Sequence, residues 1–247
     1  MPAAPRMVPS AVSIDVRRAA DRFSTRIDWL DSRHSFSFGR HYDPANTNFG
    51  LLLVSNDDVV APGSGFSTHP HRDMEIVTWV LDGELAHQDS HGNSGLITPG
   101  LAQRMSAGTG MLHSEINGAG DTPVHFVQMW VLPDTESAVP SYDQLDITAE
   151  LGRGGLVPVA SGRGHDAAIS IRQEGAVLWA ARLQPGETVQ LPDAPYVHLF
   201  VAKGSVALET AGVLVRGDAV RLTAAGGPAL TAGEASEVLV WEMTTQT

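Results

Sequence analysis

The apolar positions of this chain fall into short runs that are rich in Val, Ile, Leu and Trp. Runs such as IVTWVLDGE at 76–84, VHFVQMWVLP at 124–133 and VHLFVAKGS at 197–205 each contain or adjoin a Gly, Pro or Asp. β-Branched and aromatic runs separated by turn residues at this spacing are typical of the strands of a sandwich or barrel. Only residues 17–31 and 143–151 could hold one or two helical turns, so we expect an all-β fold with little helix.

The two halves of the chain repeat one arrangement of turns and apolar runs. In the first half, a Pro-Gly turn at 62–63 precedes a long apolar run that ends at Gly83, and a Gly turn follows at 100. In the second half, a Pro-Gly turn at 185–186 precedes a run that ends at Gly204, and a Gly turn follows at 217. Such an echo indicates internal duplication of one β-barrel unit.

A polar segment bounded by prolines, PDTESAVP at 133–140, is the natural linker between the duplicated units. The sequence therefore predicts a flexible start at 1–12, a first domain at 13–138 and a second domain at 139–247.

Composition narrows the classes of function. Twenty-eight acidic residues against 16 Lys and Arg give a net charge of −12, which repels phosphate backbones and disfavours direct nucleic-acid binding. The chain has no cysteine, which excludes disulfides, thiolate nucleophiles and cysteine zinc sites, and mildly favours a cytoplasmic location. The first residues lack the apolar core of a signal peptide, and no later run is long enough to span a bilayer, so no membrane association is expected.

Two short motifs carry candidate chemistry. In the extended segment His69-Pro70-His71, residues two apart point to the same face and can approach one ion together. His113 and Glu115 have the same spacing and follow a glycine-rich turn, SAGTG. Three imidazoles and a carboxylate suit Fe, Ni, Cu, Mn or Zn better than Ca. Each pair alone is weak, because two exposed histidines on a strand usually have no function.

The order of the two motifs strengthens this interpretation. Gly63 precedes His69 by six positions, and Glu75 follows His71 by four. Further along the chain, Gly110 precedes His113 by three positions, and Asn117 follows His113 by four. These spacings match the two motifs of the cupin superfamily.

The run from HPHRDMEIVTWVLDGEL to GTGMLHSE resembles the signature of the pirin family, and LDSRHSFSFGRHYDP at 30–44 resembles the opening of its bacterial quercetinase-like members. The resemblance is strong over residues 28–132 and implies a bicupin, with two jelly-roll β-barrels in tandem. It also implies that the metal ligands are His69, His71, His113 and Glu115. In most cupins the glutamate of the first motif is a ligand, so Glu75 is the rival to Glu115.

Other polar residues have simpler explanations. We expect His87 and Asp89 to belong to a polar turn with Asn93. His125 alternates with apolar residues and could line the barrel, although a core histidine with satisfied hydrogen bonds is commoner. For His34, a surface or interface role is at least as expected as catalysis. The roles of Glu75, His87 and His125 stay open.

The second half lacks the metal-binding motifs. Aligning the turns of the two halves places Gln190 and Pro192 at the first pair of ligand positions, and Leu230 and Ala232 at the second. We therefore expect one metal per chain, with the second barrel serving as a packing partner.

The resemblance implies a quercetin 2,3-dioxygenase activity, in which O2 opens the ring of a flavonol-like substrate and carbon monoxide is released. Fe(II) is the favoured metal, with Ni, Cu, Mn, Zn and Co as alternatives, and Glu115 is the candidate catalytic proton acceptor. The alternative is a metal- or redox-sensing regulator that binds a protein partner, as eukaryotic pirins do. The native metal and physiological substrate stay open, and a monomer is mildly favoured.

Overall fold

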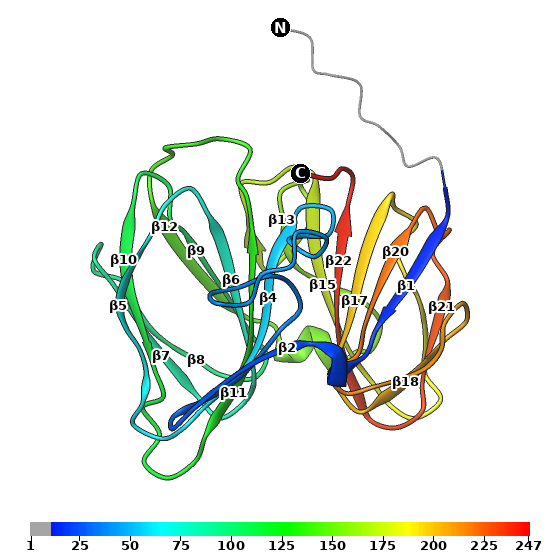
Figure 1. Ribbon diagram of the computed structural model, residues 1–247, viewed down its shortest axis with the longest axis horizontal. Helices are drawn as coiled ribbons and strands as arrows, with labels where there is room; N and C mark the ends of the chain where they lie inside the picture. The colour runs from blue at the N-terminus through cyan, green and yellow to red at the C-terminus, as the bar shows by residue number, and fades with distance from the viewer. Residues whose placement is uncertain (1–10) are drawn as a thin grey trace, which may run out of the picture.

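The computed structural model describes residues 11–247 as two β-barrels that lie side by side (Figure 1). The expectation of an all-β bicupin is confirmed. The expected flexible start falls almost wholly on residues 1–10, which lie outside the described part. Residues 17–31 form a 3-10 turn, η1 (Ala19–Asp21), and parts of three strands, and 143–151 contain the short helix α1 (Thr148–Leu151). No helix within residues 11–247 is long and apolar enough to cross a membrane.

The first barrel consists of a seven-stranded and a four-stranded sheet. The larger sheet has the order β12-β9-β6-β11-β4-β3-β2, and the smaller has the order β5-β10-β7-β8. Their bounds are β2 (Phe23–Ile27), β3 (Leu30–His34), β4 (Leu52–Val60), β5 (Gly65–His71), β6 (Glu75–Asp82), β7 (Leu85–Asp89), β8 (Ser94–Ile97), β9 (Leu101–Ser106), β10 (Met111–Ile116), β11 (Val124–Val131) and β12 (Ser141–Asp146).

The second barrel repeats this plan. Its larger sheet has the order β1-β20-β17-β22-β15-β13-β14, and its smaller sheet has the order β16-β21-β18-β19. The bounds are β1 (Ser13–Arg17), β13 (Val157–Ser161), β14 (Ile169–Ser170), β15 (Ala176–Leu183), β16 (Thr188–Gln190), β17 (Tyr196–Lys203), β18 (Ser205–Leu208), β19 (Gly212–Val215), β20 (Ala219–Thr223), β21 (Ala229–Ala232) and β22 (Ser236–Met243).

Two edge strands connect the barrels. Strand β1 comes before the first barrel in the chain, yet it pairs with β20 of the second. Strand β12 follows the expected linker, yet it pairs with β9 of the first barrel. Each barrel therefore takes one edge strand from the other half of the chain, as divided at residue 139. The domain bounds remain a prediction.

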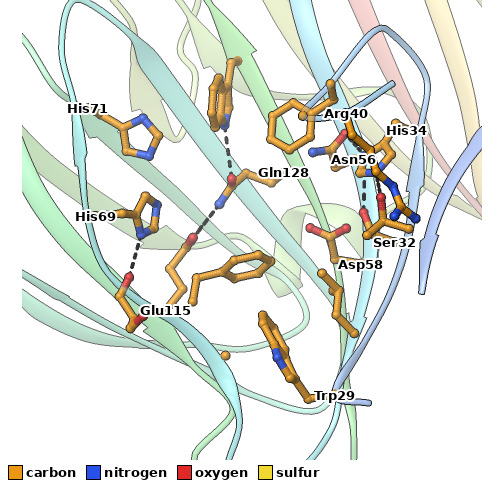
Figure 2. Close-up of a pocket in the computed structure, with 18 residues that line it drawn as sticks. Trp29, Ser32, His34, Arg40, Asn56, Asp58, His69, His71, Glu115 and Gln128 are labelled. Atoms are coloured by element: carbon orange, nitrogen blue, oxygen red, sulfur yellow. Dashed lines mark hydrogen bonds between the residues drawn. The ribbon is translucent and has the colours of Figure 1, made fainter. Parts of the chain in front are cut away.

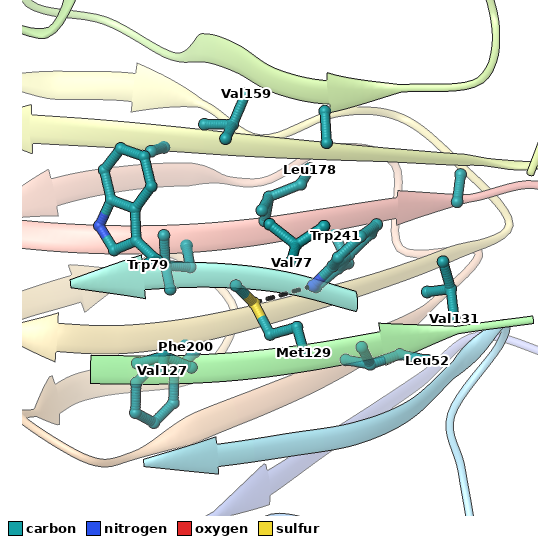
Figure 3. Packing of buried hydrophobic residues seen from close by; sticks show 14 of the residues in the cluster. Leu52, Val77, Trp79, Val127, Met129, Val131, Val159, Leu178, Phe200 and Trp241 are labelled. Atoms are coloured by element: carbon teal, nitrogen blue, oxygen red, sulfur yellow. Dashed lines mark hydrogen bonds between the residues drawn. The ribbon is translucent and has the colours of Figure 1, made fainter. Parts of the chain in front are cut away.

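The two seven-stranded sheets face each other across the largest apolar core (Figure 3). Trp79 on β6 and Trp241 on β22 are fully buried there. The indole of Trp241 donates to the sulfur of Met129 at 3.2 Å, and that of Trp79 donates to Glu237 at 2.6 Å. Because residues of both halves fill one core, the barrels form a single packed body.

The interiors of the two barrels differ. A continuous apolar cluster fills the second barrel and includes Leu230 and Ala232, which occupy the positions aligned with metal ligands. In the first barrel, two small apolar clusters lie apart, around Phe126 and around Met105. Buried polar side chains and a cavity occupy the space between its sheets.

Candidate metal centre

Strands β5 and β10 bring the two histidine motifs together. They are antiparallel neighbours in the four-stranded sheet, and His113 is directly opposite His69. Beyond this pair the register shifts, so that Glu115 is opposite Phe66. Between these two pairs, β5 advances by three residues while β10 advances by two, so β5 carries a β-bulge. A β-bulge changes the direction of the side chains next to it.

Three imidazoles converge at this point (Figure 2). The ring centroids of His69 and His113 are 4.4 Å apart, and that of His71 lies 4.9 Å from each. One nitrogen of each ring lies within 4.8 Å of the others. The Nδ1–H of His69 donates to the carbonyl oxygen of Ser67 at 2.8 Å, which leaves the lone pair on Nε2 free for an ion.

The other two histidines also present free nitrogens. Nε2 of His71 and Nε2 of His113 are buried and have no hydrogen-bond partner. Burial and the neighbouring His69 lower the pKa of His71 to about 4. Burial, His69 and His71 lower the pKa of His113 to about 2. Both imidazoles are therefore neutral at pH 7, which is the state that binds metals.

Glu115 lies beside the imidazoles in a fixed orientation. The side-chain amide of Gln128 donates to both carboxylate oxygens at 2.8 Å, and the hydroxyl of Thr78 donates at 3.4 Å. The indole of Trp130 donates to the amide oxygen of Gln128 at 3.1 Å, which turns the amide nitrogen toward Glu115. Burial raises the pKa of Glu115. One carboxylate oxygen of Glu115, one nitrogen of His113 and one nitrogen of His87 lie within 4.8 Å of one another.

The polar turn at 87–93 has a second role that the sequence did not indicate. Asp89 accepts hydrogen bonds from the backbone of His91 and Asn93, as a turn residue does. His87, however, is buried, with its Nδ1 3.4 Å from Nδ1 of His113 and its Nε2 3.5 Å from Asp89. His113, His87 and Asp89 thus form a line behind the imidazole cluster. The explanation of His87 by turn structure alone was incomplete, because β7 pairs with β10.

Glu75 and His125 lie away from this cluster. Glu75 accepts hydrogen bonds from the Ser106 hydroxyl at 2.7 Å and from the backbone N–H of Arg172 at 3.1 Å. His125 pairs with Asp57. Among residues 11–247, neither belongs to a group with metal-binding spacing. The rival ligand Glu75 instead joins the first barrel to the second half of the chain.

A cavity of about 580 Å³ opens beside the imidazoles (Figure 2). Its lining includes Trp29, Phe38, Phe66 and Trp130 as well as the polar side chains of strands β3 and β4. His34 is buried in its wall, so the expectation of a surface role for this residue was wrong. The alternation of Ser32 and His34 in LDSRH was the available signal for a shared face.

Comparison with known protein families and sequences gives matches over both halves. A family model described as Pirin matches residues 15–131, and one described as the quercetinase C-terminal cupin domain matches residues 158–243. A protein of Mycobacterium tuberculosis, named only provisionally as a quercetin 2,3-dioxygenase, is 62% identical over 232 residues, which are 94% of this chain and 95% of that protein. The quercetin 2,3-dioxygenase of Escherichia coli K12 is 39% identical over 79% of this chain and 84% of its own.

A solved structure shares the whole architecture. The crystal structure of the bacterial pirin YhhW from Escherichia coli, in complex with nickel(II), aligns with a TM-score of 0.86 and 35% identity. The alignment covers 94% of this chain and 100% of that one. The arrangement of the two barrels is therefore shared with a protein that binds a divalent metal.

Proposed function

This chain belongs to the pirin family, and from that membership and the geometry of the site we propose that it is a metal-dependent dioxygenase. In this proposal, His69, His71, His113 and Glu115 hold one divalent transition metal. The substrate is a flavonol such as quercetin, whose central ring is opened by one O2 with release of one carbon monoxide.

The observation that carries the proposal is the set of free nitrogens beside the cavity. The buried Nε2 atoms of His71 and His113 have no partner, and hydrogen bonding leaves Nε2 of His69 available too. Buried polar atoms without partners are rare in folded proteins and call for a ligand. Three neutral imidazoles with a carboxylate fit a borderline divalent ion, and the adjoining cavity can hold a flat aromatic molecule.

When bound, such an ion stabilises the negative charge that develops on the flavonol 3-oxygen as its hydroxyl loses a proton. The side chains of the protein supply the remaining functions. Glu115 is the candidate acceptor for this proton, because it is buried beside the cavity and its pKa is raised. Gln128 keeps the carboxylate in place. Trp29 and Phe66 give the cavity apolar walls that exclude water from the ring.

We propose Fe(II) as the native metal. Nitrogen and oxygen ligands of this kind bind several first-row ions, with affinities that follow the Irving–Williams order, so cellular supply decides occupancy. Nickel is bound in the YhhW structure, and Ni(II) is the first alternative to test. Elemental analysis of protein purified without added metal would identify the ion.

The first experiment is oxygen-dependent loss of quercetin absorbance by protein loaded separately with Fe(II), Ni(II), Cu(II) or Mn(II). Turnover with carbon monoxide release is expected for at least one metal, and a double variant, His69→Ala with His71→Ala, should lose both metal and activity. Replacing Glu115 by Ala should abolish turnover, and full activity with metal still bound would rule out its role as proton acceptor. Absence of turnover with every bound metal would favour the regulatory alternative.

A further inference from the structure

The cavity has a second polar end, which faces the imidazole cluster from the opposite side (Figure 2). It is formed by Ser32 and His34 on β3 and by Asn56 and Asp58 on β4. Ser32 is paired with Asp58 across the two strands, and His34 with Asn56. Side chains of paired residues project to the same face of a sheet, so these four form one surface, here called the distal polar wall.

Half of the distal polar wall is satisfied internally. Nδ1 of His34 is 2.9 Å from the side-chain oxygen of Asn56, and Nε2 is 2.9 Å from the hydroxyl of Thr25. Burial lowers the pKa of His34, so the ring is neutral and both of its nitrogens are engaged. These contacts fix the wall before any ligand arrives.

Asp58 differs from its neighbours. Its exposed fraction is 3%, and its Oδ1 atom is buried without a hydrogen-bond partner. Arg22, whose charge acts on Asp58, forms its ion pair with Asp57 instead. A carboxyl group buried in this way is costly unless a further group bonds to it. Burial raises the pKa of Asp58 to about 7, although a hydrogen bond from Ser32 opposes the rise, so the neutral and ionised forms coexist near neutrality.

The space between the two polar ends is bordered by aromatic rings. Trp29 packs edge-on against Phe66 at 5.3 Å, and Phe38 packs edge-on against Trp130 at 5.6 Å. All four side chains line the cavity. A complementary ligand is therefore flat and apolar in its middle, with a polar group at each end.

We propose that Asp58 is a specificity-determining residue, which hydrogen-bonds a phenolic hydroxyl on the part of the substrate farthest from the metal-binding residues. The inference deepens the proposed dioxygenase function and rests on it. It narrows the substrate class to flavonols that carry a hydroxyl besides the one at C3. An ionised Asp58 accepts a hydrogen bond from this hydroxyl, and a protonated Asp58 donates one to its oxygen.

The test compares quercetin with 3-hydroxyflavone, which has the same rings and the 3-hydroxyl but no other hydroxyl. The metal-loaded wild type should prefer quercetin in kcat/KM, and Asp58→Leu or Asp58→Ala should reduce this preference about 10-fold or more, because loss of a hydrogen bond to a buried polar group discriminates strongly. Asp58→Asn keeps an acceptor oxygen and should retain part of the preference. Asp166→Leu, at an exposed aspartate of the second barrel, is the matched control and should leave it unchanged.

Damage to folding or to the metal site lowers both kcat/KM values together, so the ratio reports recognition alone. Anaerobic binding of both flavonols, followed by quenching of tryptophan fluorescence, gives the same ratio without turnover. If the wild type binds quercetin more tightly, the Asp58 variants lose this binding preference and no protein turns over either flavonol, then the dioxygenase proposal fails while the recognition by Asp58 is supported. An unchanged ratio in both Asp58→Leu and Asp58→Ala, or no preference in the wild type, would overturn the inference. Galangin, whose hydroxyls other than the 3-hydroxyl lie on the fused benzene ring only, then shows which ring reaches Asp58.

Discussion

At the scale of single residues, a second layer of side chains contacts His113 and can determine which of its nitrogens is free to bind an ion. His87 lies 3.4 Å from Nδ1 of His113 and is itself bonded to Asp89. If Nδ1 of His113 carries the proton and donates it to His87, then Nε2 keeps its lone pair for the ion. Outer residues that hold a ligand in this way orient its ring and strengthen metal binding.

Replacing His87 by Phe should therefore weaken metal binding about 10- to 100-fold, the range found when such outer partners are removed. The aromatic ring preserves most of the packing against Tyr142, which stacks on His87 at 4.8 Å. Competition with a chelator of known affinity measures the effect. Equal affinity in His87→Phe and wild type would mean that the line of hydrogen bonds to Asp89 does not orient His113.

Gln128 controls the protonation of Glu115. Its amide donates to both oxygens of the carboxylate, which stabilises the ionised form and offsets part of the rise in pKa that burial causes. In Gln128→Leu the donors are gone, so the pKa of Glu115 should rise further. The acidic limb of the pH–activity profile and of metal binding should then move to higher pH, as titrations of both proteins would reveal. If the acidic limb of Gln128→Leu stays at the wild-type pH, then a group other than Glu115 causes that limb.

The sequence predicted part of this site. Alternation along an extended strand was sufficient to place His69 and His71 on one face, and the structure brings His113 to them. The role of the four residues as ligands remains a prediction. His87 could not be recognised, because its position behind His113 depends on the pairing of β7 with β10, which the turn residues do not specify. Asp58 escaped notice for the same reason, since its place opposite the imidazoles depends on how the larger sheet closes over the smaller one.

At the scale of elements, the pairing of β5 with β10 depends on Gly65. A Cβ atom at this position would lie 2.2 Å from the carbonyl oxygen of Glu115 and 2.7 Å from the Cα of Ile116. Because both are backbone atoms, the strand carrying Glu115 would have to move. The close approach thus links the spacing of these two strands to the geometry of the site.

Gly65→Ala should lower the free energy of unfolding by about 1–3 kcal/mol, as overpacking does elsewhere, and should also weaken metal binding. Gly118→Ala is the matched control, because a Cβ there meets nothing within 4 Å. Urea denaturation of the two variants gives the comparison. Equal stability of both would show that β10 moves at no cost.

The elements themselves were largely foreseen, and their pairing was not. The duplicated turn pattern predicted two similar barrels, and the apolar run at 76–84 became β6. The exchange of β1 and β12 between barrels could not be predicted from periodicity, because an edge strand has the same alternating pattern whichever sheet it joins. The region 17–31 has a helix-compatible pattern, yet most of it is strand, since pairing of β2 with β3 overrides local preference.

At the scale of the whole molecule, the two halves are held together by apolar packing, and some of the polar groups buried near that packing are neutral. His198 on β17 is one of these groups. It is buried in the second half, and its ring lies 5.9 Å from that of Phe36 in the first. Its Nε2 has no partner, and burial together with Arg221 and Arg22 lowers its pKa to about 3.

A depressed histidine pKa makes stability depend on pH with a definite sign. In the unfolded chain His198 takes up a proton below about pH 6.5, whereas in the folded protein it stays neutral down to about pH 3. The contribution of His198 to the free energy of unfolding is therefore fully present above pH 6.5. It decreases by about 1.4 kcal/mol for each pH unit as the pH falls below that value. Asp58, whose pKa is raised to about 7 in the folded protein, has the opposite effect at pH values between this pKa and its lower pKa in the unfolded chain. The measured dependence of stability on pH therefore does not isolate either group.

The difference between wild type and His198→Phe does isolate the histidine. The substitution removes the titrating group and retains a ring beside Phe36, so any change in packing adds an offset that does not vary with pH. With metal removed from both proteins, the variant should gain stability relative to wild type by about 1.4 kcal/mol per pH unit between pH 6.5 and pH 4. Urea denaturation at several pH values measures this gain. Parallel stability curves would mean that His198 is protonated in the folded protein as readily as in the unfolded chain, and that the boundary between the barrels admits water and charge.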